Sequence, residues 1–139
     1  MVNFGGARMI EIGAEIPQRV FYIDRTMLKA YADASGDQNP IHQNEEFAKS
    51  VGLPDVIAHG MLTMALAGKY VSDIAGSAAV KEFSARFTKP VVVPAGVDVS
   101  LVISAKVASL EGGLAKLEIT AAVDDVKVLG MAKATIAVA

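Results

Sequence analysis

Residues 35–42, SGDQNPIH, bring an acid, an amide and an imidazole together within eight positions. A carboxyl group at Asp37 and an imidazole at His42 can give and take protons, and each contributes typically about 10² to 10⁴ in rate when placed against a substrate. The two positions share no helix face well, but Pro40 argues against a helix, and a bent loop could turn both side chains into one pocket. Asp, Asn and His also suit an ordinary turn, because Asp and Asn bond readily to nearby backbone. Spacing alone leaves both interpretations open.

His59 and Gly60 stand at the start of a long apolar segment. If a helix begins there, its first N–H groups have no partner inside the helix, and the helix dipole favours negative charge at that end. Such an end can hold a developing oxyanion, where loss of one donor costs about 10² to 10³ in rate. The alternative is a glycine that merely lets a helix start in a tight space.

Other kinds of site fit the sequence poorly. The two histidines lie 17 positions apart without an HExxH-type pattern, and there is no cysteine, so we predict no metal site. Ser35 has no partner arrangement for a nucleophilic triad, and no glycine-rich phosphate loop is present. The net charge of −2 gives no basic footprint for nucleic acid.

Length and composition bound the class of protein. A chain of 139 residues fits one domain, and its 53% apolar content predicts apolar surface buried against a partner. The longest apolar stretches fall far short of the roughly 20 residues that span a membrane. The absence of cysteine and of a signal-peptide pattern leads us to expect a cytoplasmic protein.

Helix and strand signals predict the elements that precede the motif. Residues 17–23 are typical of a short strand. Asp24 is a plausible N-cap for a helix over 25–35, and Gly36 stands where a C-cap glycine belongs. The motif therefore begins where a helix stops.

The motif itself is expected to form a loop. Asn39 precedes a proline, which biases it away from helical geometry, so residues 36–43 should be extended. Asn44 can then cap a short helix over 45–51. The segment GLPD ends that helix.

The second half of the chain combines one helix with several strands. From Gly60 to residue 76 the sequence is apolar on nearly every helix face, which is typical of a helix buried inside a protein. From residue 80 the hydrophobic period changes to two, which indicates an antiparallel meander with one wet face. The expected strands are 97–104, 116–121 and 126–138, with turns at 111–113 and 123–125, and an edge or bent strand at 89–94 between two prolines. We therefore predict an α+β fold in which an antiparallel sheet wraps around a long central helix.

With these residues in view, the sequence resembles the MaoC-like dehydratases, or hydratase-2 family, which have the hot-dog fold. The family motif, S-G-D-x-N-P-hydrophobic-H after a Tyr or Phe, matches Tyr31 and residues 35–42 without departure. The segment IAHGMLTM, 57–64, resembles the start of the family's helix. ARFTKPVVVPAG, 85–96, resembles its strand segment, although the usual glycine-acid ending is here Pro-Ala-Gly.

The resemblance covers residues 10–139 and implies a single hot-dog domain over 1–139. It implies reversible dehydration of (3R)-hydroxyacyl thioesters to trans-2-enoyl thioesters, without metal or cofactor. Asp37 and His42 would supply the acid and the base, in an order that spacing leaves open, and the Gly60 N–H would hold the thioester oxygen. The implied substrate-binding residues are Asn39, His59 and Met61.

Within the family, the sequence most resembles the beta subunit of (3R)-hydroxyacyl-ACP dehydratase, the catalytic half of a heterodimer in type II fatty-acid elongation. A homodimeric (R)-specific enoyl-CoA hydratase has nearly the same motif. A non-catalytic acyl-binding hot-dog subunit is an alternative of another class, and a thioesterase is a weaker one. The expected substrate is acyl-ACP or acyl-CoA. The expected assembly is a homodimer, or a heterodimer with a second hot-dog subunit.

Overall fold

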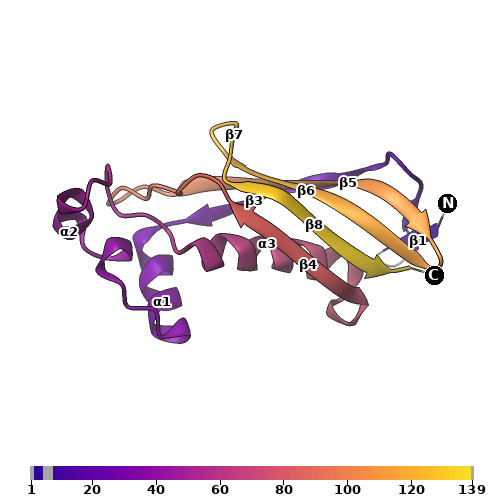
Figure 1. Ribbon diagram of the computed structural model, residues 1–139, viewed down its shortest axis with the longest axis horizontal. Helices are drawn as coiled ribbons and strands as arrows, with labels where there is room; N and C mark the ends of the chain where they lie inside the picture. Colours follow the sequence, from indigo (N-terminus) through magenta and orange to yellow (C-terminus); the bar gives the residue numbers. More distant parts are fainter. Residues whose placement is uncertain (1, 5–7, 139) are drawn as a thin grey trace.

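The computed structural model describes residues 2–4 and 8–138. A broad antiparallel sheet covers one side of a long helix, and two shorter helices lie together at one end of the molecule (Figure 1). The predicted α+β architecture, a sheet around a central helix, is confirmed.

Five long strands form the main path of the sheet within the described residues. They are β3 (Glu15–Ile23), β4 (Val80–Phe87), β5 (Val99–Glu111), β6 (Leu114–Val123) and β8 (Leu129–Ala137). Their order is β3-β5-β6-β8-β4, and each neighbouring pair is antiparallel. The short strand β7 (Val126–Lys127) pairs with β6 beside this path. Strands β3 and β4 are therefore the two edges of the sheet.

The first predicted strand begins earlier than expected, and its ladder is interrupted. β3 starts at Glu15 rather than at residue 17, and its pairing with β5 shifts register between Ile16 and Arg19. Pro17 lies inside this shift, and it has no N–H to donate to a ladder. An edge strand tolerates such a gap, because one of its sides has no neighbour.

Two strand predictions in the second half are wrong in detail. The last strand is not continuous over 126–138, because Val128 separates β7 from β8. The segment 89–94 is not a strand: only Val92 pairs there, in a single bridge with Ile57. Its flanking prolines remove N–H donors that a ladder would need.

The core lies between the sheet and the central helix. Alternate residues of β5 and β6 are buried, as the period of two predicted. Val97, which was expected to begin that alternation, precedes β5 and is exposed. The largest fully buried side chains of the sheet are Ile23, Leu101, Ile103, Leu117, Leu129 and Ile136.

The helices match their predicted starts closely. They are α1 (Arg25–Ser35), α2 (Glu45–Ser50) and α3 (Gly60–Ala75), with short 3-10 turns η1 (Pro40–His42) and η2 (Ser77–Ala79). The predicted caps of α1 are confirmed: the Asp24 side chain accepts a hydrogen bond from the Met27 N–H at 2.8 Å, and Gly36 ends the helix with φ 82°. A left-handed φ of this kind favours glycine.

The central helix α3 is less buried than the sequence predicted. Leu62, Leu66 and Tyr70 face the sheet and are buried. A stripe at four-residue spacing faces outward instead, and Met61 on it is 55% exposed. The other exposed residues of this stripe are Ala65, Lys69 and Asp73. Among the residues that the structure describes, none covers this face of the helix.

The first strands of the chain were not predicted. β1 (Val2–Phe4) and β2 (Arg8–Ile10) form a separate antiparallel pair. Residues 1, 5–7 and 139 of the expected domain, 1–139, lie outside the described residues, so that boundary stays a prediction. Among the described helices, none has the length and apolar character needed to cross a membrane.

Candidate active site

The turn that carries His42 differs from the extended loop that was expected, because Pro40–His42 form one turn of 3-10 helix. Proline suits the first position of a helix, where its fixed φ fits and its missing N–H would have no partner anyway. Asn39 caps this turn, since its side-chain oxygen accepts a hydrogen bond from the Ile41 N–H at 3.2 Å. The turn directs His42 inward, and the residue is only 7% exposed.

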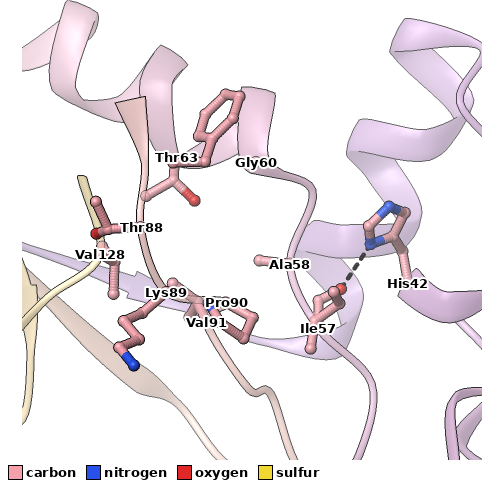
Figure 2. A pocket seen from close by; sticks show the side chains of 11 residues that line it. His42, Ile57, Ala58, Gly60, Thr63, Thr88, Lys89, Pro90, Val91 and Val128 are labelled. Atoms are coloured by element: carbon pink, nitrogen blue, oxygen red, sulfur yellow. Dashed lines mark hydrogen bonds between the residues drawn. The ribbon is translucent and has the colours of Figure 1, made fainter. Parts of the chain in front are cut away.

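His42 is oriented by the backbone of the segment that leads into α3. Its Nδ1 lies 2.7 Å from the carbonyl oxygen of Ile57 (Figure 2). A carbonyl only accepts, so Nδ1 carries the proton of the neutral ring and Nε2 keeps its lone pair. Burial lowers the pKa of His42, and the nearby His59 lowers it further, against the opposing effects of the Ile57 hydrogen bond and of Asp37. These effects favour a neutral ring, and no hydrogen bond to its Nε2 is found among the described residues.

His59 lies directly behind His42. The two ring centroids are 3.8 Å apart and the planes are inclined by 23°, which is a stacked arrangement. The Nε2 of His59 lies 3.1 Å from the backbone carbonyl oxygen of Asp37 and donates to it. Its Nδ1 is buried and has no hydrogen-bond partner in the part of the chain that the structure describes. The Tyr31 ring also packs against His59, tilted by 59° at a centroid distance of 4.8 Å.

Asp37 lies at the rim of this cluster and is exposed. Its Oδ1 accepts a hydrogen bond from the Asn39 N–H at 3.1 Å, so the side chain helps to bend its own loop. One polar atom from each of Asp37, His42 and His59 lies within 4.8 Å of the other two. The fold thus brings the acid and the imidazole of the motif together, while their roles stay a prediction.

A metal ion suits this cluster poorly, for a different reason than the sequence offered. The separation of 17 positions between the histidines is closed by the fold, so it excludes nothing. However, the lone pair of an imidazole nitrogen lies in the ring plane, and a metal sits about 2.0–2.1 Å away along it. The lone pairs of two stacked rings run side by side and do not converge on one ion. The prediction of no metal therefore stands on this geometry and stays a prediction.

A cavity of about 310 Å³ opens beside His42 (Figure 2). Its wall is mostly apolar. One side includes Ala58, which precedes α3, and Gly60, which begins it; the opposite side includes Val91 and Val128. Apart from Gly60, only His42 of the predicted site residues lies on this wall. Asp37, Asn39, His59 and Met61 do not.

Gly60 is the first residue of α3, and no side chain caps this helix end. A helix leaves its first N–H groups without internal partners, and the Gly60 N–H has no acceptor among the described residues, so it can bond to a ligand. The backbone here lies tightly against Phe87, because a Cβ added at Gly60 would come within 3.2 Å of that ring. Phe87 itself also lines the cavity.

Sequence reasoning missed several residues of the cavity wall. Thr63 is a polar residue on an apolar helix, three positions after Gly60, and that contrast was a usable signal. Lys89 and Thr88 follow the edge strand β4 and carried no such signal. Their place on the wall depends on how the segment after β4 folds back against α3.

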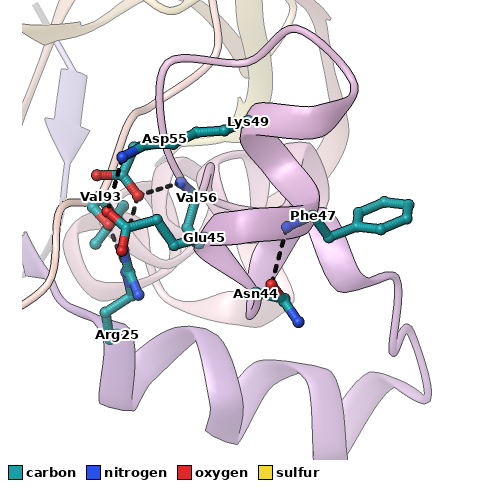
Figure 3. Close-up of polar contacts among 8 residues, drawn as sticks. All are labelled: Arg25, Asn44, Glu45, Phe47, Lys49, Asp55, Val56 and Val93. Atoms are coloured by element: carbon teal, nitrogen blue, oxygen red, sulfur yellow. Dashed lines mark hydrogen bonds and ion pairs between the residues drawn. The ribbon is translucent and has the colours of Figure 1, made fainter.

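A charged clamp holds the segment before α3 (Figure 3). Arg25 at the start of α1 donates from Nε to the Val93 carbonyl at 2.6 Å and from a terminal nitrogen to Asp55 at 2.8 Å. The same Asp55 oxygen accepts a hydrogen bond from the Val56 N–H at 2.7 Å. The next residue is Ile57, whose carbonyl orients His42, so the clamp connects α1 to the geometry of the site.

Comparisons with known proteins agree with this picture. The sequence matches the MaoC like domain family over residues 11–123. A 3-hydroxyacyl-thioester dehydratase X from Mycobacterium tuberculosis is 42% identical over 79 residues, which are 57% of this chain and 28% of that protein. A peroxisomal enoyl-CoA hydratase 2 from Arabidopsis thaliana is 43% identical over 56 residues, which are 38% of this chain and 18% of that protein. The chain thus matches less than a third of the length of either relative.

A solved structure described as a MaoC-like dehydratase superposes with a TM-score of 0.91 at 35% identity. The superposition covers 94% of this chain and 41% of that one, so the other chain is more than twice as long. The family match spans both the motif and the start of α3. The chain therefore belongs to the MaoC-like dehydratase family and has its hot-dog fold.

Proposed function

We propose that this chain carries the acid–base site of an (R)-specific hydro-lyase that interconverts (3R)-hydroxyacyl and trans-2-enoyl thioesters. The observation that carries the proposal is the state of His42. Its Nδ1 is tied to the Ile57 carbonyl, which leaves the lone pair on Nε2; the residue lines an apolar cavity, and the Asp37 carboxylate is close by. The names of the similar proteins point to the same chemistry.

The chemistry requires two proton transfers around one carbon–carbon bond. In dehydration, a base removes the proton from Cα, the C–O bond at Cβ breaks, and an acid protonates the departing hydroxyl, which leaves as water. His42 and Asp37 form the acid–base pair for these transfers. The lowered pKa of His42 favours a ring that begins neutral near neutral pH and takes the Cα proton; that proton then passes, directly or by way of the Asp37 carboxylate, to the departing hydroxyl.

The thioester oxygen gains negative charge as the Cα proton leaves. The Gly60 N–H, at the positive end of α3, would bond to that oxygen. The mostly apolar wall of the cavity would take the first part of the acyl chain, because such a surface gains from contact with hydrocarbon. In this proposal Asn39 shapes the turn that carries His42. Met61 does not line the cavity, so it would contact only a part of the substrate that extends beyond the cavity.

The finer assignment is a dehydratase subunit that acts on an ACP-linked substrate, as in the beta subunit of (3R)-hydroxyacyl-ACP dehydratase. Asp37 is exposed, and Met61 and Phe87 leave apolar surface open beside the cavity, which supports a second hot-dog unit over the site. The similar solved chain is more than twice as long, so it has room for such a unit. A homodimeric (R)-specific enoyl-CoA hydratase is the second candidate, favoured by the similarity to an enoyl-CoA hydratase.

The deciding experiment is a hydration assay on crotonyl-CoA and on enoyl-ACP of several chain lengths. The absorbance of the conjugated thioester should fall, and the hydrated product should be the 3R enantiomer. His42→Gln should abolish this, while Glu46→Gln, a change on exposed α2, should not. A folded protein that binds acyl thioesters without hydrating either carrier would contradict the proposal and favour the non-catalytic acyl-binding subunit. Release of free thiol instead of hydration would indicate a thioesterase.

A further inference from the structure

We infer that His59 is a positioning residue, which fixes the His42 ring and the Asp37 peptide relative to each other without touching the substrate. The inference rests on the proposed function, since it concerns the same acid–base pair. It replaces the expectation that His59 contacts substrate directly. His59 is 2% exposed and is absent from the cavity wall, whereas His42 lies on it.

Two contacts of the His59 ring carry the inference. Its face lies against the His42 ring at 3.8 Å, which limits how that ring can tilt about its bond to Ile57. Its edge donates from Nε2 to the Asp37 carbonyl at 3.1 Å, which holds the peptide that bears the acid. One side chain therefore restrains both proton-transfer groups, from a position behind them.

The polarity of His59 needs a reason, because an apolar ring would fill the same space at less cost. A buried polar atom without a partner costs free energy, and His59 Nδ1 is such an atom within the described residues. The donor to Asp37 is what an apolar ring would lack. Tyr31 from α1 also packs against the His59 ring, so two aromatic neighbours restrain it.

The stack also places a second titratable ring against the base. A positive charge on the neighbouring His59 ring disfavours a charge on His42, so His59 contributes to the lowered pKa of His42. The other groups that face the pair are the Asp37 carboxylate from the loop after α1 and the Tyr31 hydroxyphenyl ring from α1. The Ile57 carbonyl lies before α3, and Lys89 reaches the cavity from the segment after β4.

Two variants separate the two contacts. His59→Phe keeps a ring for the stack but has no donor for the Asp37 carbonyl. His59→Gln keeps an N–H donor but removes the stack. Each should lower kcat by up to about 10²-fold with KM little changed, because a misplaced proton-transfer group slows chemistry more than binding. In both variants the acid limb of the pH profile should move to higher pH, and further in His59→Gln, where the ring no longer shields His42 from water.

A second readout is independent of activity. The ring signals of His42, followed by NMR through a pH titration, should report a higher pKa in both variants. In the unchanged protein, nitrogen NMR should find the proton of His42 on Nδ1 and that of His59 on Nε2. These measurements test the positioning role even if no thioester proves to be a substrate, so its failure and that of the proposed function can be told apart.

The inference would be overturned by folded variants that keep both kcat and the His42 titration of the unchanged protein. It would also be overturned if KM rose while kcat stayed constant, since that pattern belongs to a residue that binds substrate. If neither variant folds, the tautomers that nitrogen NMR finds for His42 and His59 in the unchanged protein still test the inference. A His59 proton on Nδ1 instead of Nε2 would refute the bond to Asp37.

Discussion

The Nδ1 atom of His42 lies 2.7 Å from the carbonyl oxygen of Ile57, although the two residues are separated by the whole of α2. This bond selects one neutral tautomer, with the proton on Nδ1 and the lone pair on Nε2. It also ties the 3-10 turn of the motif to the segment that becomes α3. The proposed base, His42, and the proposed oxyanion donor, the Gly60 N–H, are thus both connected to one stretch of backbone, three residues long from Ile57 to His59.

The first prediction concerns the acid–base pair. Asp37→Asn and His42→Gln should each lower hydration by at least about 10²-fold, because each removes a proton-transfer group from the site. The double variant should lose little more than the worse single variant, since the pair acts as a unit. Steady-state kinetics and circular dichroism would check this. A folded single variant that retains most activity would show the assignment to be wrong.

The second prediction concerns the pH dependence of activity. The pKa of His42 lies below the ordinary value of about 6.5, mainly because burial disfavours the charged ring. A base must be unprotonated, so kcat/KM for dehydration should stay near its maximum as the pH falls to about 6.5 and decline only below it. A pH–rate profile whose acid limb lies above that value would contradict the burial argument.

The third prediction concerns stability, and its sign follows from the same shift. Below about pH 6.5 the unfolded chain protonates His42 while the folded chain resists it, so the unfolded state binds more protons. This contribution to the free energy of unfolding is complete above that pH and is lost as the pH falls towards the folded pKa. Denaturant unfolding at pH 7.5 and 5.5 should therefore show a smaller loss for His42→Gln than for the unchanged protein.

Two carboxyl groups also have shifted pKa values, but they do not contribute to the loss of stability between pH 7.5 and 5.5. Hydrogen bonds from Gln38 to Asp33 and from Arg19 to Asp73 hold their pKa values below the usual 3.8. Depressed carboxyl pKa values weaken the folded state only at more acid pH. Equal losses for His42→Gln and the unchanged protein between pH 7.5 and 5.5 would mean that His42 contributes nothing to this dependence.

The fourth prediction concerns the start of α3. Gly60→Ala places a Cβ about 3.2 Å from the Phe87 ring, and Phe87 is exposed enough to move aside. We expect the free energy of unfolding to change little, while hydration falls about 10-fold or more because the shifted ring narrows the approach to the Gly60 N–H. Gly60→Val, with a larger side chain, should abolish activity.

Gly68→Ala is the matched control in the middle of the same helix. A Cβ there meets open space, so this variant should gain up to about 1 kcal/mol of stability and keep its activity. If Gly60→Ala retained full activity, close approach of the substrate to that backbone would be excluded. A ligand-bound structure with the thioester oxygen far from the Gly60 N–H would exclude it as well.

The fifth prediction concerns the clamp between Arg25 and Asp55. Asp55→Asn should cost about 1–3 kcal/mol of stability, because it weakens two short hydrogen bonds that are largely shielded from water. It should also lower kcat, since Val56 precedes the carbonyl that orients His42. Lys49→Met, which breaks an exposed pair with Glu45 nearby (Figure 3), should change stability by less than about 1 kcal/mol. Equal losses of stability in Asp55→Asn and Lys49→Met would contradict a stabilising role for the clamp between Arg25 and Asp55.

Assembly remains a prediction with a direct test. β4 is an edge of the sheet, and Phe87 at its end and Met61 on α3 expose apolar surface beside the cavity. Open edges and apolar patches of this kind favour association. Sedimentation of the chain alone should therefore show a homodimer. If the chain alone is a monomer, it should form a heterodimer when a second hot-dog chain is added. A fully active monomer at low micromolar concentration would refute the expectation.

Local signals in the sequence determined most of the elements. Asp24 and Gly36 set the bounds of α1 because a side-chain cap and a left-handed glycine act within a few residues of the helix end. The period of two in β5 and β6 fixed which residues face the core. The motif matched its family without departure, so its chemistry could be proposed before any contact was known. The 3-10 turn at Pro40 was missed because proline fits both an extended loop and a first helical turn.

Only the tertiary structure decided which distant residues meet. Ile57 and His59 lie 15 and 17 positions beyond His42, and no local pattern connects the three, yet they determine its tautomer and restrain its ring. The exposure of Met61 and Ala65 on α3 was hidden for a similar reason: in sequence they look like the buried apolar residues of that helix, and only the one-sided sheet decides which of them are covered. Hydrogen bonds and ring contacts across the fold depend on how whole elements pack, and that packing has no counterpart in the spacing of residues along the chain.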